Sequence, residues 1–281
     1  MDIRKFLCDI FDRDVISLSD YETRIVKLNN FFKSHCNRSF QAFYRGDRFC
    51  TPTQSKLFRN DLLSSEHTEF ENFSLDTHDG FQSDFEKLAY MQHYQGQTRL
   101  LDFSKDPLVA LRFACGTRKD NCRKKVTFYY TNYIDDPNSS EEIQILMQLV
   151  KSPVAFSIVK IKDQLRNQGY NIEAEKIVKT FSEDYFVEGN FDDLRMERQK
   201  SIFLFMGNIE NYRFNSELPG RNQRCRYKVI HELSPTVGRG RMYPGYVGVF
   251  NIAAEAVPGI REELENTEEY NMNWLMPPKG E

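Results

Sequence analysis

The sequence predicts an α+β fold. Stretches rich in β-branched and aromatic residues, such as 125–132 and 246–252, are separated by stretches of helical spacing, but the two kinds do not alternate strictly. With 23 Phe and 14 Tyr in 281 residues, the chain has enough large side chains for a sizeable core. We expect an N-terminal helical cap over residues 1–39, one large domain over 40–265 and a C-terminal tail over 266–281.

The N-terminal cap is predicted from the spacing of its apolar residues. They recur at intervals of three, four and six, as one face of a helix requires: Val15, Tyr21, Ile25, Leu28 and Phe32. Ser19 or Asp20 is available as the N-cap. Residues 40–46 then have the composition of a strand that ends at Gly46, and residues 47–80 are polar and predicted to be irregular.

Three elements follow closely between residues 81 and 115. A helical pattern begins at Phe81 and ends near Gly96, and residues 98–103 have the pattern of a short strand. The next helix has strong start signals, because Asp106 can serve as its N-cap and Pro107 occupies its first position.

The second half of the chain is predicted to be rich in strands. Five runs have strand composition: 125–132, 153–161, 200–206, 226–233 and 246–252. Residues 257–270 have a helical pattern. The segment 207–245 is rich in Gly, Pro, Asn and Arg, so we expect a long functional loop there.

Composition limits the possible functions. The net charge of −3 and the pI near 6.0 give no overall attraction to nucleic acid or to anionic membranes. No run reaches the roughly 18 apolar residues of a membrane span, and the first residues are too charged for a secretory signal, so we expect a cytoplasmic protein without membrane contact. The 6 cysteines form no CxxC pair, which indicates reduced thiols and no metal site.

Arg99 and Asp102 place two charges inside residues 91–115, a stretch that otherwise has the pattern of a buried strand followed by a buried helix. A strand period of two places Thr98, Asp102 and Ser104 on one face and Arg99 on the other. A strand that carries polar side chains toward a helix N-terminus favours an anionic ligand such as a phosphate.

Each of these candidates also has a structural interpretation. Arg99 and Asp102 can form an ion pair, while Ser104 or Asp106 caps the next helix. Arg45 can clamp a phosphate with its planar guanidinium or lie at the surface. His93 can act as an acid or base or simply pack within the core.

Farther along the chain, a predicted strand places Glu197 and Gln199 on one face, where both can reach one ligand. Solvation of an edge strand accounts for them equally well.

Three blocks of the sequence resemble the FRG domain family. They are "FYRGD" at 43–47, "MQHYQGQTRLLDFSKDPLVALRFAC" at 91–115 and "RMERQKSIF" at 195–203. The resemblance covers residues 40–265. Gln95 ahead of the glycine, Ser201 in place of a glycine, and "WLMPPKG" in place of an acidic closing motif depart from the family pattern.

A remote resemblance extends to the ADP-ribosyltransferase superfamily. It implies split antiparallel sheets flanked by helices, with NAD+ as substrate in a cleft between the strands. Arg45 matches the arginine of the first strand, Ser104 the last serine of the second strand, and Glu197 with Gln199 the third element. Gln199 stands where the catalytic glutamate is expected. Either Glu197 or Asp102 then supplies the negative charge, or the site binds a nucleotide without cleaving it.

The resemblance implies a role for each candidate residue. Arg45, flanked by Tyr44 and Gly46, would bind the pyrophosphate with Arg99 as a second cation. His93 and Tyr94 would line the nicotinamide or its ribose, and Thr98 and Ser104 would bond to ribose. The residues implied in catalysis are Glu197, Gln199, His93 and Asp102.

The function implied is an NAD-dependent ADP-ribosyltransferase or NAD glycohydrolase, acting as a toxin or an antiphage-defence component. Its partners would be a protein or nucleic-acid acceptor and an antitoxin or trigger protein. Basic residues in the long loop are candidates for binding nucleic acid: Arg221, Arg224, Arg226, Lys228, Arg239 and Arg241. A non-catalytic module that binds a nucleotide or a protein is the alternative, and a metal-free hydrolase that uses His93 with Asp102 is a third.

Overall fold

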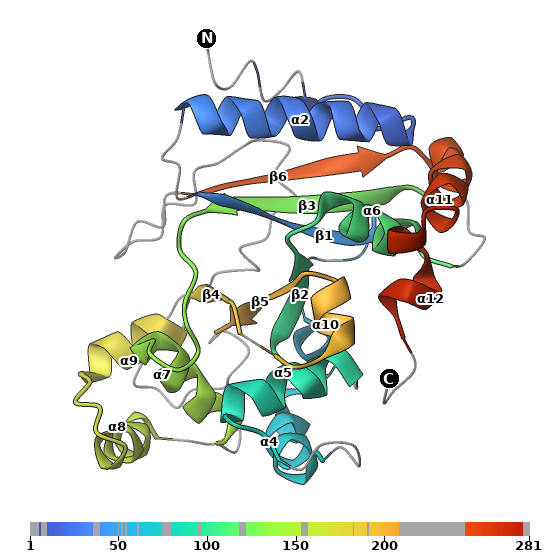
Figure 1. Cartoon of the computed structure of the whole chain (residues 1–281). Coiled ribbons are helices and arrows are strands. Elements are labelled where there is room, and N and C mark those ends of the chain that lie inside the picture. The colour runs from blue at the N-terminus through green and yellow to red at the C-terminus, as the bar shows by residue number, and fades with distance from the viewer. Residues whose placement is uncertain are drawn as a thin grey trace.

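The computed structural model has mixed α and β structure, as the sequence predicts (Figure 1). The residues that it describes are 6, 10–35, 40–49, 51, 53, 55–60, 62–74, 80–94, 97–117, 122–152, 157–181, 183–189, 191–207 and 245–277. No helix in these ranges is both long and apolar enough to cross a membrane.

Within the described residues, six antiparallel strands form one sheet in the order β4-β5-β2-β1-β3-β6. The strands are β1 Gln41–Arg48, β2 Leu100–Ser104, β3 Lys124–Thr131, β4 Asp184–Val187, β5 Ser201–Met206 and β6 Gly245–Ile252. The two central strands meet in a single residue pair, Tyr44 with Ser104. The sheet therefore consists of two three-stranded halves joined at a narrow seam, rather than the two separate sheets that were expected.

The helices surround these two halves (Figure 1). They are α2 Leu18–His35, α3 Lys56–Arg59, α4 Leu63–Asn72, α5 Asp84–Tyr94, α6 Pro107–Cys115, α7 Glu141–Val150, α8 Ile158–Asn167, α9 Ala174–Phe181, α10 Leu194–Arg198, α11 Val257–Glu265 and α12 Met272–Leu275, with short 3-10 turns η2 Ala254–Ala256 and η3 Glu268–Tyr270. In α2 the hydroxyl of Ser17, rather than Ser19 or Asp20, accepts the N–H of the first turn.

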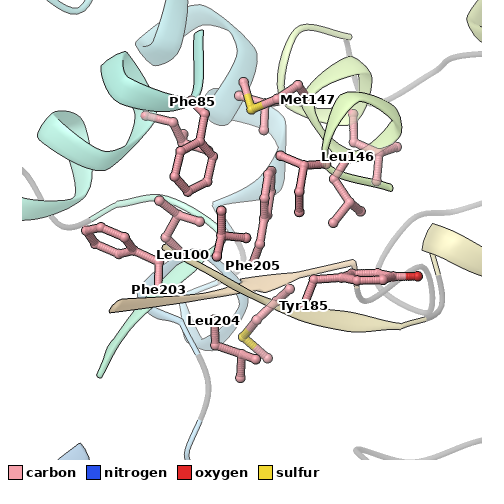
Figure 2. Close-up of a cluster of buried hydrophobic side chains, with 14 of the residues drawn as sticks. Phe85, Leu100, Leu146, Met147, Tyr185, Phe203, Leu204 and Phe205 are labelled. Carbon is pink, nitrogen blue, oxygen red and sulfur yellow. The ribbon is translucent and has the colours of Figure 1, made fainter. Parts of the chain in front are cut away.

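The described residues form two hydrophobic cores, which are divided at strand β1. Phe43 belongs to one and its neighbour Tyr44 to the other, because successive side chains of a strand point to opposite faces. The Tyr44 core packs α2, α6 and α11 against β1, β3 and β6. In the other core, Figure 2 shows Phe85 of α5 and Met147 of α7 above Phe203 and Phe205 of β5.

The start of α6 confirms the prediction from local sequence. The carboxylate of Asp106 accepts hydrogen bonds from the backbone N–H groups of Leu108 and Val109, at 2.8 and 3.4 Å. Pro107 is the first helical residue. The helix lies so close to β1 that a Cβ atom on Gly46 would be 1.9 Å from the carbonyl oxygen of Ala110. Contrary to the prediction, Gly46 does not end its strand, which continues to Arg48.

Three segments differ from their predicted structure. The segment 47–80 contains α3 and α4, and α4 was missed because one of its inward positions is the charged Glu66. Residues 158–161 start α8 instead of a strand, since Ile161 and Leu165, one turn apart, are both buried. Residues 194–198 form α10, so Glu197 is not on a strand. The expected strand 226–233, and the loop 207–245 apart from its two end residues, lie outside the described residues.

Cys115 and Cys122 are free thiols. Cys115 is buried in α6, and burial raises the pKa of its thiol to about 11. Cys122 is exposed. The described ranges hold no group of three or more His, Cys, Asp or Glu side chains that could bind a metal ion.

Candidate functional site

Asp102 of β2 is held by a chain of hydrogen bonds from α5. The side-chain N–H of Gln92 donates to Asp102 Oδ2 at 2.7 Å. The side-chain oxygen of Gln92 accepts a hydrogen bond from the Thr98 hydroxyl, also at 2.7 Å. The hydroxyl of Thr98 in turn accepts the N–H of Leu100 at 3.0 Å. Each group in the chain has a fixed partner, so the orientation of the Asp102 carboxylate is set by its neighbours.

Arg45 joins this arrangement from β1, across the seam of the sheet. Its Nη1 donates to the backbone carbonyl of Asp102 at 2.7 Å and lies 3.9 Å from the carboxylate oxygen Oδ2. Its Nε and Nη2 donate to both carboxylate oxygens of Asp47, at 2.9 and 3.2 Å. The Arg45 side chain is 15% exposed and that of Asp102 39% exposed, so solvent reaches both.

Three polar atoms around Asp102 are buried without a hydrogen-bond partner in the described structure. They are Asp102 Oδ1, His93 Nε2 and Arg195 Nε. His93 senses the charges of both Asp102 and Arg195, so the three side chains lie near one another. Buried polar groups are nearly always paired, so three unpaired ones near one another call for an explanation such as a bound ligand, ion or water. A ligand that both donates and accepts hydrogen bonds would satisfy this cluster.

Burial keeps His93 uncharged. The side chain is 6% exposed, and its ring meets the edge of Phe203 at 5.4 Å between centroids. Burial lowers the pKa of His93 below its usual 6.5, although the charge of Asp102 opposes this shift. Within the described residues no hydrogen bond joins His93 to Asp102, so the structure gives no support to a catalytic pair of these two residues.

Tyr94 stands at the edge of the same cluster. Its hydroxyl donates to Asp193 Oδ2 at 2.8 Å, and burial with this contact raises its pKa to about 12. The guanidinium of Arg195 lies 5.9 Å from the centre of the Tyr94 ring. Asp193 also caps α10 by accepting the N–H of Met196, and this fixes Arg195 beside α5.

The structure places Arg99 away from this cluster. Its side chain is fully buried and paired with Glu66 of α4, not with Asp102. Nη1 also lies 3.5 and 3.4 Å from the backbone carbonyls of Met206 and Gly207. The guanidinium is therefore enclosed by protein groups, and the expected role of Arg99 as a second pyrophosphate ligand does not fit this geometry.

Ser104 and Gln199 bond to each other instead of facing a ligand. The Ser104 hydroxyl donates to the backbone carbonyl of Gln199 at 2.7 Å. The side-chain N–H of Gln199 donates to the carbonyl of Leu275 at 2.8 Å, so the C-terminal turn covers it. Glu197 is exposed on α10. These three residues do not form the shared ribose contact that was expected.

Tyr44 and Gly46 lie on the opposite face of β1 from Arg45. Tyr44 is buried in the core beneath α2 and α6, and burial raises the pKa of its hydroxyl. Gly46 is needed for the close approach of α6. Both residues support the strand that carries Arg45, and neither residue reaches Asp102. Thr98 is likewise buried and acts through Gln92.

The residues gathered around Asp102 come mainly from one continuous stretch of sequence. Arg45, Gln92 and His93 all fall within the range that a known family model matches. Residues 40–123 match the FRG domain. The match to the FRG domain ends before the third block, so it covers Arg45, Gln92, His93 and Asp102 but not Arg195, Glu197 or Gln199. No curated protein and no solved structure matches the chain.

Sequence reasoning missed several residues of the site. Gln92 and Asp47 lie inside the first two FRG blocks, and their polar side chains next to His93 and Arg45 were the available signal. Asp193 and Arg195 approach through α10, a connection that no local pattern encodes. The basic residues proposed for nucleic acid, Arg221 to Arg241, lie outside the described residues.

A surface depression of about 550 Å³ lies elsewhere on the molecule. It is lined by residues of α4 and its neighbours: Thr68, Glu69, Asn72, Phe73 and Gln97. None of the residues around Asp102 lines it. The depression is open, and no lysine or arginine is among these lining residues. We therefore place the candidate site at Asp102.

Proposed function

We propose that the protein binds NAD+ at the Asp102 cluster and breaks the bond between nicotinamide and ribose. The observation that carries this proposal is the carboxylate of Asp102. Gln92 fixes one of its oxygens, while the other is buried and unpaired. A carboxylate with unmet accepting capacity beside solvent is suited to stabilise a positive charge that develops on a ligand.

The chemistry requires negative charge at one point of the substrate. When the C–N bond breaks, its electron pair leaves with nicotinamide and the ribose becomes cationic. Water or another acceptor then bonds to the ribose carbon and loses a proton. Asp102 takes the role that the resemblance gives to Glu197 or Gln199, because Gln199 is covered and Glu197 is exposed on α10.

Neighbouring residues have supporting roles in this proposal. Arg45 holds the strand of Asp102 through the backbone carbonyl and offers a cation to the phosphates of NAD+. His93 is uncharged because burial lowers its pKa, so its ring does not repel a cationic ribose. The unpaired Nε of Arg195 can donate to an oxygen of the nicotinamide amide or of ribose.

The acceptor and the biological role follow from the resemblance alone. Transfer to a protein or nucleic acid, and action as a toxin or antiphage-defence component held by an antitoxin or released by a trigger protein, all presuppose that NAD+ is cleaved. Nicotinamide release is therefore the property to test first.

The test measures nicotinamide release from NAD+ by the wild-type protein and by Asp102→Asn and Arg45→Gln. Asp163→Asn, which changes an exposed carboxylate on α8, is the matched control. We expect both site variants to lose about a hundredfold or more of the rate, and the control to keep it. Circular dichroism and thermal unfolding confirm that each variant is folded. Equal rates for Asp102→Asn and the wild type would refute the proposal.

The same experiment tests the alternative of a non-catalytic binding module. In that case NAD+ raises the melting temperature of the wild type without any release of nicotinamide, and Arg45→Gln abolishes the rise. If NAD+ causes neither nicotinamide release nor a rise in melting temperature, NAD+ is excluded as the ligand.

A further inference from the structure

The segment after β1 folds back over the face of the sheet that carries Arg45. Lys125 of β3 donates to the carbonyl of Thr51 at 2.5 Å, and the hydroxyls of Thr53 and Thr127 are 3.3 Å apart. Thr127 is the direct partner of Arg45 in the β1–β3 register. These contacts place Thr51 and Thr53, which precede α3, against the strand next to Arg45, and the charge of Arg45 acts on Arg59 at the end of α3.

Arg59 has no partner for its charge in the described part of the chain. Its Nε is buried without a hydrogen-bond acceptor, and no described carboxylate forms an ion pair with it. Asp47 is near enough for its charge to act on Arg59, but both of its oxygens already accept from Arg45. A buried N–H donor without an acceptor, as at Nε of Arg59, is unusual in a folded protein.

The two guanidinium groups also repel each other. Burial lowers the pKa of Arg59, and the charge of Arg45 lowers it further. Arg45 has Asp47 and, at 3.9 Å, Asp102 as counter-ions, whereas Arg59 forms an ion pair with neither in the described structure, so the charge of Arg59 is not directly paired. An anion with several oxygens would neutralise that charge and accept from both side chains.

We propose that Arg59 and Arg45 together bind the phosphate groups of the nucleotide, which rests on the proposed function of the Asp102 site. This assigns the second cation of the phosphate subsite to Arg59 instead of Arg99. Planar guanidinium groups match phosphate oxygens in geometry and in charge. The subsite selects ligands that carry a diphosphate, such as NAD+ or ADP-ribose, over a nucleoside without phosphate.

The experiment measures binding of ADP-ribose and of inorganic pyrophosphate by calorimetry. The proteins compared are wild type, Arg59→Gln, Arg59→Lys and the control Arg166→Gln, which removes an exposed arginine from α8. We expect Arg59→Gln to bind both probes at least about tenfold more weakly, Arg59→Lys to recover part of the loss, and the control to bind normally. The melting temperature of Arg59→Gln should not fall, because the substitution removes a repulsion.

The results separate this inference from the proposed function. Pyrophosphate binding that needs Arg59, in a protein that releases no nicotinamide, supports the phosphate subsite and removes only the catalysis. Normal nicotinamide release with an unchanged KM for NAD+ in Arg59→Gln overturns the subsite and leaves the catalysis. Failure of the wild type to bind either probe also overturns the subsite. So does a loss of affinity in Arg59→Gln that is accompanied by a lower melting temperature, because the loss then reflects a damaged fold.

Discussion

Arg99 and Glu66 form an ion pair that is almost closed to solvent. Nε of Arg99 lies 3.0 and 3.1 Å from the two carboxylate oxygens of Glu66, and the backbone N–H of Arg99 donates to the same carboxylate at 3.2 Å. The side chains are 0% and 2% exposed. The pair fastens α4 to the residue that precedes β2, and so supports the strand on which Asp102 lies.

We predict that Glu66→Gln destabilises the protein by about 3–5 kcal/mol, because it leaves the buried charge of Arg99 without a counter-ion. Urea denaturation followed by circular dichroism measures the change. Glu69→Gln on the same helix is the control, with an expected change within about 0.5 kcal/mol. A loss below about 1 kcal/mol for Glu66→Gln would show that water or another group takes over the partner's role.

Gly46 provides a second test, of packing rather than charge. In Gly46→Ala the new Cβ would lie 1.9 Å from the carbonyl oxygen of Ala110 and 2.5 Å from the backbone nitrogen of Ala114. Since backbone atoms of a helix cannot move aside cheaply, we predict a loss of about 3 kcal/mol or more in unfolding free energy. Gly259→Ala in α11 meets nothing within 4 Å and should gain up to about 1 kcal/mol. Equal stability of the two variants would contradict the close approach of α6 to β1.

The sequence predicted those elements whose signals are local. Asp106 and Pro107 mark the start of α6 within two residues, and the observed cap uses the expected carboxylate. The partner of Arg99 could not be predicted in this way. Glu66 is 33 positions away along the chain, and its burial depends on how α4 packs.

The third block, residues 195–203, shows that a strand-like alternation of side chains can lead to a wrong prediction of secondary structure. Charged and polar residues at 195–200 fit the period of a strand, but Asp193 caps a short helix there. The chain changes from helix to strand at Lys200, whose φ of 48° lies in the left-handed region. Gln199 therefore lies on a turn, and its side chain points to the C-terminal segment. The Asp102 cluster was predicted in part, because Arg45 and His93 belong to recognisable blocks.

The lowered pKa of the buried His93 leads to a prediction of how the stability of the protein depends on pH. The pKa of His93 in the folded protein lies below its value of 6.5 in the unfolded chain, so only the unfolded chain binds a proton as the pH falls below about 6.5. Stability should therefore fall with acid from that point down to the folded pKa, by up to about 1.4 kcal/mol per pH unit. Urea unfolding of the wild type and His93→Gln at pH 7.5, 6.5 and 5.5 measures this slope. His67→Gln should keep the slope that His93→Gln loses, and identical slopes in all three proteins would show that His93 titrates normally.

A substitution at Gln199 tests the remote resemblance to the ADP-ribosyltransferase superfamily, in which this position is expected to carry the catalytic glutamate. If this position were the catalytic one, Gln199→Glu would create or raise nicotinamide release. The structure predicts the reverse, because the side-chain N–H of Gln199 donates to the buried carbonyl of Leu275 at 2.8 Å. A glutamate carboxylate at this position has no N–H to donate, so its oxygen would lie against the carbonyl oxygen of Leu275. We expect this to lower the free energy of unfolding by about 1–3 kcal/mol or more.

We therefore expect Gln199→Glu to be less stable in urea than the wild type, with no gain in nicotinamide release. Gln164→Glu, an exposed change of the same kind on α8, should alter neither property. If Gln199→Glu were stable and released nicotinamide faster than the wild type, the C-terminal turn would have to open in solution. The catalytic charge would then belong to this position and not to Asp102.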